Sequence, residues 1–231
     1  MYWLIVVIVV GIIIFFVWAS ADVGSNVYLK TLCKADREDK VVSLTFDDGP
    51  DKIITPLVLD ILKEYDIKAT FFLIGKKAEK HPYLVKQIVE EGHIIANHTY
   101  SHSGFFPLSN KKRVKEEIKD CNVVIKNAIG RKSKLFRPPF GVTNPIIAKV
   151  VKEKELKAIG WSIRSLDTMN KSRESINKKV ISKLHPGAII LLHDSCRDAD
   201  VLLKQLILSI LEKGYKILPL DEMLNIEVYE S

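Results

Sequence analysis

Two short polar segments, about fifty residues apart, carry the side chains best suited to chemistry in this chain. The first is Asp47-Asp48-Gly49-Pro50, and the second runs from His98 to His102 with a histidine at each end. Two imidazoles and one carboxylate bind a divalent metal such as zinc and leave a coordination position for water. The remaining carboxylate is then available as a base for that water. The two segments together predict a hydrolytic metal site.

Each segment also has an ordinary explanation. Asp, Gly and Pro favour turns after strands, and two histidines four apart fit a polar helix face or a solvated loop. Their context favours the functional interpretation, because residues 41–46 and 93–97 have the β-branched and apolar pattern of strands. Loops that follow strands are where rigid scaffolds place functional groups.

The elements around these segments predict an α/β fold. The chain has 231 residues, 47% of them hydrophobic and 27% charged, which fits one globular domain with a terminal appendage. We expect helices between the strands, and this alternation predicts a parallel sheet, either closed as a barrel or doubly wound. The carboxyl ends of the strands would then share one functional face. The predicted strands are residues 41–46, 69–74, 93–97, 135–137, 157–162, 188–193 and 215–218.

Helix boundaries follow from capping residues. Thr55 is expected to cap a helix that has Pro56 in its first turn. Pro82 is expected to open the next helix, which Gly92 closes. A long helix is predicted between Ser109 and Gly130.

Further polar groups follow the later strands. Arg137 precedes two prolines, which have no amide donors, so the amides of Phe140 and Gly141 are the next that can point into a cleft. An arginine there can orient a carboxylate, and a surface turn with an incidental arginine is the alternative. His193 ends the apolar run 188–193 and could be structural, and Asp167 could cap a helix or pair with His193.

Taken in order, these motifs resemble the polysaccharide deacetylases of carbohydrate esterase family four, the NodB homology domain, over residues 41–224. The resemblance implies a distorted (β/α) barrel with about seven parallel strands, to which this chain adds an N-terminal hydrophobic helix. It also implies one divalent metal ion, for which we expect zinc, with cobalt, nickel or manganese as alternatives.

The resemblance assigns the metal-side roles residue by residue. Asp47 matches the catalytic base, and Arg137 matches the arginine that orients it. Asp48, His98 and His102 match the metal ligands.

It assigns the substrate-side roles in the same way. His193 matches the general acid, and Asp167 matches the carboxylate that tunes it. The Phe140 amide matches an oxyanion donor, Leu191 matches the wall around the acetyl methyl, and we expect Trp161 to contact substrate.

Three positions depart from the family pattern. Phe140 stands where a tyrosine is frequent, Arg164 where an acid is frequent, and Thr168 where an aromatic, usually tryptophan, is frequent. None is a metal ligand or a proton-transfer group. They predict a groove that is more open and less aromatic.

The net charge and the cysteines say less about function than the motifs do. The net charge is +7, which a lysine-rich surface explains, with attraction to anionic envelope polymers as a second interpretation. We see no nucleic-acid recognition motif and expect no nucleic-acid partner. Cys121 lies on an apolar helical stripe and is expected to be a buried thiol. A disulfide from Cys33 to Cys121 or Cys196 is left open.

The N-terminus predicts a membrane segment. Residues 2–19 are almost unbroken apolar sequence, near the length of a membrane span, and Ala19-Ser20-Ala21 also fits a signal cleavage site. The basic residues after the run would keep the domain in the cytoplasm, whereas acetylated structural glycans lie outside. We expect a single-pass cell-membrane anchor with an extracytoplasmic domain, or secretion after cleavage. The predicted layout is anchor 1–21, linker 22–40 and deacetylase domain 41–226.

The predicted function is metal-dependent removal of acetyl from N-acetylated amino sugars of a peptidoglycan-like or chitin-like polysaccharide, with release of acetate. Three alternatives remain open. They are deacetylation of O-acetyl esters in a glycan such as xylan, a non-catalytic glycan-binding domain, and a membrane protein with a merely structural soluble domain.

Overall fold

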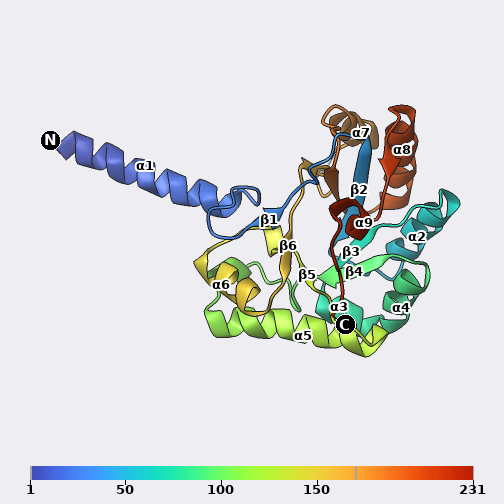
Figure 1. The fold of residues 1–231 in the computed structure, drawn as a ribbon, viewed down its shortest axis with the longest axis horizontal. Coiled ribbons are helices and arrows are strands. Elements are labelled where there is room, and N and C mark those ends of the chain that lie inside the picture. Colours follow the sequence, from blue (N-terminus) through green and yellow to red (C-terminus); the bar gives the residue numbers. More distant parts are fainter. Residues whose placement is uncertain (1, 170, 231) are drawn as a thin grey trace.

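The structure, a computed structural model, describes residues 2–169 and 171–230. Its centre is a curved parallel sheet whose strands follow the order β1-β6-β5-β4-β3-β2-β8-β7, with β9 paired to β2 (Figure 1). The strands are β1 Thr31–Leu32, β2 Val41–Asp47, β3 Thr70–Leu73, β4 Ile94–Asn97, β5 Leu135–Phe136, β6 Lys157–Ile159, β7 Ile163–Arg164, β8 Ala188–His193 and β9 Lys216–Ile217.

Helices α2 to α8 lie between the strands along the chain and pack around the sheet (Figure 1). The helices are α1 Tyr2–Ala21, α2 Ile54–Glu64, α3 Gly75–Lys80, α4 Pro82–Glu90, α5 Lys111–Ile129, α6 Pro145–Glu153, α7 Arg173–Ile181, α8 Ala199–Glu212 and α9 Leu220–Leu224, with 3-10 turns η1 Phe106–Leu108 and η2 Pro139–Gly141.

Strand β2 is buried along its whole length. Its side chains alternate between the two faces of the sheet because successive residues of a strand point in opposite directions. One set, Val42, Leu44 and Phe46, joins the main apolar core. The other set carries polar groups that end at Asp47, and its Thr45 hydroxyl donates to the Ile190 carbonyl at 2.8 Å. The alternation therefore aims Asp47 and Thr45 at the same side of the sheet.

The predicted α/β class is confirmed, and each of the seven predicted strands is present. The sheet is a curled half-barrel, because in the described part of the chain its end strands β1 and β7 do not pair with each other. Both end strands were missed. Each has two residues, too few for a periodic signal.

The segment 22–40, predicted to be a linker, packs on the domain instead. It supplies β1, which pairs with β6, and the Ala35 amide donates to the Gly187 carbonyl at 2.8 Å.

Four helix boundaries were predicted correctly and one was not. Gly92 follows the end of α4 with φ of 84°. Pro82 begins α4, and Gly130 ends α5 in the left-handed conformation with φ of 78°. Helix α5 lies between Ser109 and Gly130 as predicted, and its cap is Asn110, whose side chain accepts the Arg113 amide. Thr55 is not the cap of α2, since it lies inside the helix and its hydroxyl donates to Asp194.

Helix α1 has 20 residues and a mean hydropathy of 3.0, enough to cross a membrane by length and composition, a criterion that a signal sequence also meets. It projects from the body (Figure 1). All three cysteines are free thiols. Cys121 is buried as predicted, and burial raises its pKa to about 12.

Candidate active site

Asp47 lies in a buried ion pair at the end of β2. Its Oδ1 accepts Arg137 Nη1 at 2.7 Å, and both residues are almost completely buried. Arg137 follows β5 and is fixed by three further hydrogen bonds, to Thr45 Oγ1 and to the carbonyls of Ile159 and Gly160. Burial raises the pKa of Asp47, and the Arg137 charge opposes that rise. A carboxylate held this rigidly, with a raised pKa, suits a general base.

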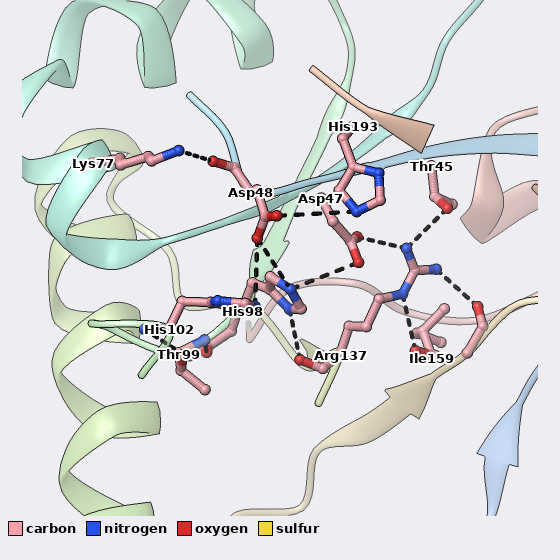
Figure 2. A network of polar contacts seen from close by, with 12 residues as sticks. Thr45, Asp47, Asp48, Lys77, His98, Thr99, His102, Arg137, Ile159 and His193 are labelled. Carbon is pink, nitrogen blue, oxygen red and sulfur yellow. Dashed lines mark hydrogen bonds and ion pairs between the residues drawn. The ribbon is translucent and has the colours of Figure 1, made fainter. Parts of the chain in front are cut away.

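The next residue, Asp48, turns away from β2 with φ of 69° and meets the two histidines. Its Oδ1 lies 3.7 Å from His98 Nε2 and 3.4 Å from His102 Nε2, as Figure 2 shows. One ligand atom from each residue falls within 4.8 Å of the others. Donor atoms bound tetrahedrally to zinc are roughly 3.3 Å apart, given zinc–ligand distances near 2 Å. The three side chains are therefore close to a coordinating arrangement.

Two details support metal binding at these three residues. Asp48 Oδ1 is buried and has no hydrogen-bond partner among the described residues, a cost that a cation would remove. His98 Nδ1 lies 2.8 Å from the Arg137 carbonyl, so that nitrogen carries the proton and Nε2 keeps its lone pair. Burial, with the neighbouring His102, lowers the pKa of His98 to about 3, which keeps its ring neutral. The residues present fit a divalent metal.

The loop from His98 to His102 is held by hydrogen bonds to α5. Asn97 ends β4, donates to the Ile118 carbonyl and accepts the Thr99 amide. Glu117, which is buried on α5, accepts both the amide and the hydroxyl of Ser101 at 2.7 Å. These bonds fix the spacing of the two imidazoles before any ion binds.

His193 ends β8 on the opposite side of the site from the imidazole pair. Its Nδ1 and its backbone amide both lie 2.7 Å from the Asp167 carboxylate, which holds the ring with Nε2 towards Asp48 at 4.0 Å. Burial lowers the pKa of His193, but the hydrogen bond and charge of Asp167, together with Asp47 and Asp48, outweigh it and the net pKa is raised. A histidine with a raised pKa suits a general acid near neutral pH.

These groups surround a cavity of about 190 Å³. Phe140, half exposed, stands over His102 with ring centroids 4.8 Å apart. Arg137 and Asp167 do not line the cavity, and they support it from behind through Asp47 and His193. The lining comprises Asp47, Asp48, His98, His102, Phe140, Trp161, Arg164, Thr168, Leu191 and His193. Of the ten residues that the sequence predicts for the site, eight line this cavity, and Arg137 and Asp167 contact two of those eight.

Backbone strain is concentrated at this face. Non-glycine residues with positive φ cost of order 1–3 kcal/mol each and cluster at functional sites. Five such residues lie on the loops that build the cavity, namely Asp48, Thr99, His102, Phe140 and Leu166. The surrounding hydrogen bonds hold them in place.

Sequence reasoning missed two supporting residues. Lys77 Nζ donates to the Asp48 carbonyl at 2.7 Å (Figure 2). Asp194 is fully buried, accepts the Thr55 hydroxyl, and fills the space where a Cβ at Gly49 would lie. Both residues brace the loop that carries Asp48. No sequence pattern marks them, because the contacts join segments far apart in the chain.

A buried carboxylate paired with an arginine, a histidine–carboxylate pair and three side chains that could hold a cation all lie at the carboxyl ends of parallel strands. This is the arrangement expected of a metal-dependent hydrolase. The chain belongs to the polysaccharide deacetylase family, whose sequence profile matches residues 34–159. This confirms the resemblance carried by its sequence motifs.

Relatives agree with this assignment. A peptidoglycan-N-acetylglucosamine deacetylase of Bacillus cereus is 36% identical over 192 residues, covering 81% of this chain and 89% of the relative. The crystal structure of the Bc1960 peptidoglycan N-acetylglucosamine deacetylase aligns with a TM-score of 0.80 at 33% identity, over 84% of this chain and 92% of that one. BA3943 of Bacillus anthracis, described as a pseudoenzyme of the same family, aligns with a TM-score of 0.77 at 28% identity, over 85% and 70%.

Proposed function

We propose that this protein removes acetyl groups from N-acetylated amino sugars of peptidoglycan, releasing acetate. One observation carries the proposal. The unpartnered Asp48 oxygen and the two imidazoles lie beside a buried base on one side and a carboxylate-supported histidine on the other. The pseudoenzyme among its structural neighbours means that the fold alone does not imply activity. The proposal therefore depends on these side chains.

We assign Asp48, His98 and His102 as ligands of one divalent ion, and zinc fits a set of two imidazoles and one carboxylate. A bound ion of this kind lowers the pKa of coordinated water and polarises a carbonyl oxygen. The remaining chemistry belongs to side chains and one backbone amide.

Asp47 accepts the proton of the attacking water. Its Oδ2 lies 3.6 Å from His98 Nε2, so the free carboxylate oxygen faces the ligand group while Arg137 holds the other one. The Phe140 amide donates to the oxygen of the tetrahedral intermediate.

His193 then donates a proton from Nε2 to the departing amine nitrogen, and Asp167 stabilises the imidazolium before the transfer. Leu191, which is buried in the cavity wall, packs against the acetyl methyl, and Trp161 packs against the sugar.

We propose that α1 remains attached as a single-pass anchor and that the domain faces away from the cytoplasm. Residues 1–21 form the anchor, and segment 22–40 packs on the deacetylase domain at 41–226 as part of one unit. Burial of Ala19 and Val23 against the domain supports retention of α1, because a cleavage site must be accessible.

The test is acetate release by the metal-loaded protein from peptidoglycan, chitin oligomers and acetylated xylan. The proposal expects release from the two N-acetylated glycans, with peptidoglycan preferred. Release from xylan alone would identify an ester deacetylase. Sugar binding without acetate release at any metal loading would identify a glycan-binding domain.

A further inference from the structure

The end of α1 is built into the catalytic domain. Ala19 is fully buried, the Ser25 hydroxyl donates to its carbonyl at 2.8 Å, and the Thr143 amide donates to the Ser20 carbonyl at 3.0 Å. Val23 is buried too, within van der Waals reach of the space beside Gly141. These contacts join the end of α1 directly to the loop that carries η2. The axis of α1 therefore has a fixed direction relative to the active site.

Exposed apolar side chains lie on the segments connected to this junction. Phe105 and Leu108 are 77% and 84% exposed at the two ends of η1, although Phe106 between them is buried in the core. Ile146, in the first turn of α6, is also exposed. Val142 shares a shallow apolar hollow with Ile13, Phe16 and Val17 of α1. We call Phe105, Leu108, Val142 and Ile146 the apolar rim.

The members of the apolar rim are held together by polar contacts. The Asn144 side chain donates to the Pro107 carbonyl at 2.7 Å and accepts the amides of Ile146 and Ile147. Asn144 thus ties η1 to the start of α6, and its neighbour Thr143 ties both to α1. Figure 1 shows that α6 and the start of α5 lie on the side of the body from which α1 departs.

The charged residues near the apolar rim favour contact with a lipid surface. Lys149 lies three residues after Ile146 on α6, hence on the same face of that helix, and Lys112 lies four residues after Leu108. Both lysines are exposed, and Lys112 lies in the first turn of α5, the helix that follows η1, rather than on a helix shared with Leu108. Apolar side chains flanked by lysines are the composition of segments that lie in the interface of a bilayer.

We propose that the apolar rim inserts into the surface of the bilayer that α1 spans, so that the catalytic cavity opens beside the lipid headgroups. The proposal rests on α1 as a retained anchor. Phe140 belongs to η2, between the Thr143 contact and His102. The metal ligands are therefore held at a fixed short height above the membrane, and the glycan they serve lies close to the membrane surface.

A fluorophore placed on the apolar rim measures its contact with lipid. Leu108→Cys and the control Leu211→Cys are each labelled with bimane, in a background carrying Cys33→Ala and Cys196→Ser. Leu211 is an exposed leucine on α8, which lies away from α1 (Figure 1). The full chain is reconstituted in phosphatidylethanolamine–phosphatidylglycerol vesicles with a nitroxide near the headgroup of some lipids.

We expect severalfold stronger quenching at position 108 than at position 211. Retention of the protein after an alkaline wash shows separately whether α1 spans the bilayer. Acetate release from soluble chitin oligomers measures the proposed activity. Equal quenching at both positions in washed, retained protein would contradict insertion of the apolar rim into the bilayer. It would leave the anchor and the activity intact. Release of the protein by the wash would contradict both the anchoring role of α1 and the insertion of the apolar rim.

A second variant avoids labelling. Phe105→Ser with Leu108→Ser should lower deacetylation of a glycan tethered to vesicles severalfold and leave the rate on soluble oligomers unchanged. Leu208→Ser with Leu211→Ser, which removes two exposed leucines of α8, should change neither rate. Equal rates on tethered glycan for the two double variants would contradict the proposal.

Discussion

The base side and the ligand side of the cavity balance their charges in different ways. On the base side, Asp47 is paired with Arg137, and the guanidinium forms four hydrogen bonds to protein atoms. On the ligand side, the adjacent Asp48 has a buried oxygen that no described residue satisfies. Two chemically identical, neighbouring side chains thus acquire separate roles from their surroundings. Asp47 is satisfied by protein groups alone, whereas Asp48 keeps a buried oxygen that a cation would satisfy.

The largest effect on stability should follow from breaking the base side. Arg137→Met leaves Asp47 buried without a partner, and loss of one member of a buried ion pair costs about 3–5 kcal/mol. Urea unfolding of the metal-free chain measures this cost. Arg37→Met, which breaks an exposed pair with Asp39, should cost far less.

Asp47→Asn should recover part of the loss when it is combined with Arg137→Met, since it removes the uncompensated charge. Equal unfolding midpoints for Arg137→Met and Arg37→Met would mean that the buried pair is not what stabilises this side.

A smaller effect, on the pH dependence of the rate, should follow from changing the partner of His193, the proposed general acid. Asp167 raises the pKa of His193, so Asp167→Asn should lower it and shift the basic limb of the pH profile of kcat/KM to lower pH by about 1 unit. Below that limb, His193 stays protonated in both proteins and the rates should converge. Asp198→Asn, which alters an exposed carboxylate, should keep the original limb. An unshifted limb in Asp167→Asn would exclude His193 as the group that sets it.

The smallest effect, on substrate preference, is expected from a substitution in the wall of the cavity. Thr168→Trp adds a stacking surface to the cavity, so it should change the preference for oligomer length by a few-fold, about the worth of one sugar–aromatic contact. Metal content should not change. Met169→Trp adds the same ring at the next residue, which does not line the cavity, and serves as the control. Identical oligomer profiles for both variants would contradict the predicted open groove.

Much of this arrangement was predictable from sequence, because parallel strands bring their carboxyl ends to one edge. Asp47, His98 and His193 each end or follow a strand, so strand prediction placed them at one edge of the sheet, and the family resemblance assigned their roles. Thr55 was assigned to helix capping from a local pattern, but its hydroxyl reaches Asp194, 139 residues away. Contacts of that range leave no periodic signal.

The bracing of Asp48 was unpredictable for the same reason. Lys77 and Asp194 support its loop from α3 and from the end of β8, elements whose sequences give no sign of that contact. The packing of segment 22–40 also depends on pairing with a distant strand, since two residues of β1 carry no pattern of their own.

The most direct test of the different roles of the two aspartates is metal content measured beside turnover in two variants. Asp48→Ala should lose metal and activity together. Asp47→Asn keeps the shape of the side chain but cannot accept the proton, so it should retain metal and sugar binding while kcat falls by roughly 10²- to 10⁴-fold, the usual contribution of a general base. Loss of metal from Asp47→Asn with retention by Asp48→Ala would reverse the two assignments, and full activity in both would contradict the deacetylase mechanism.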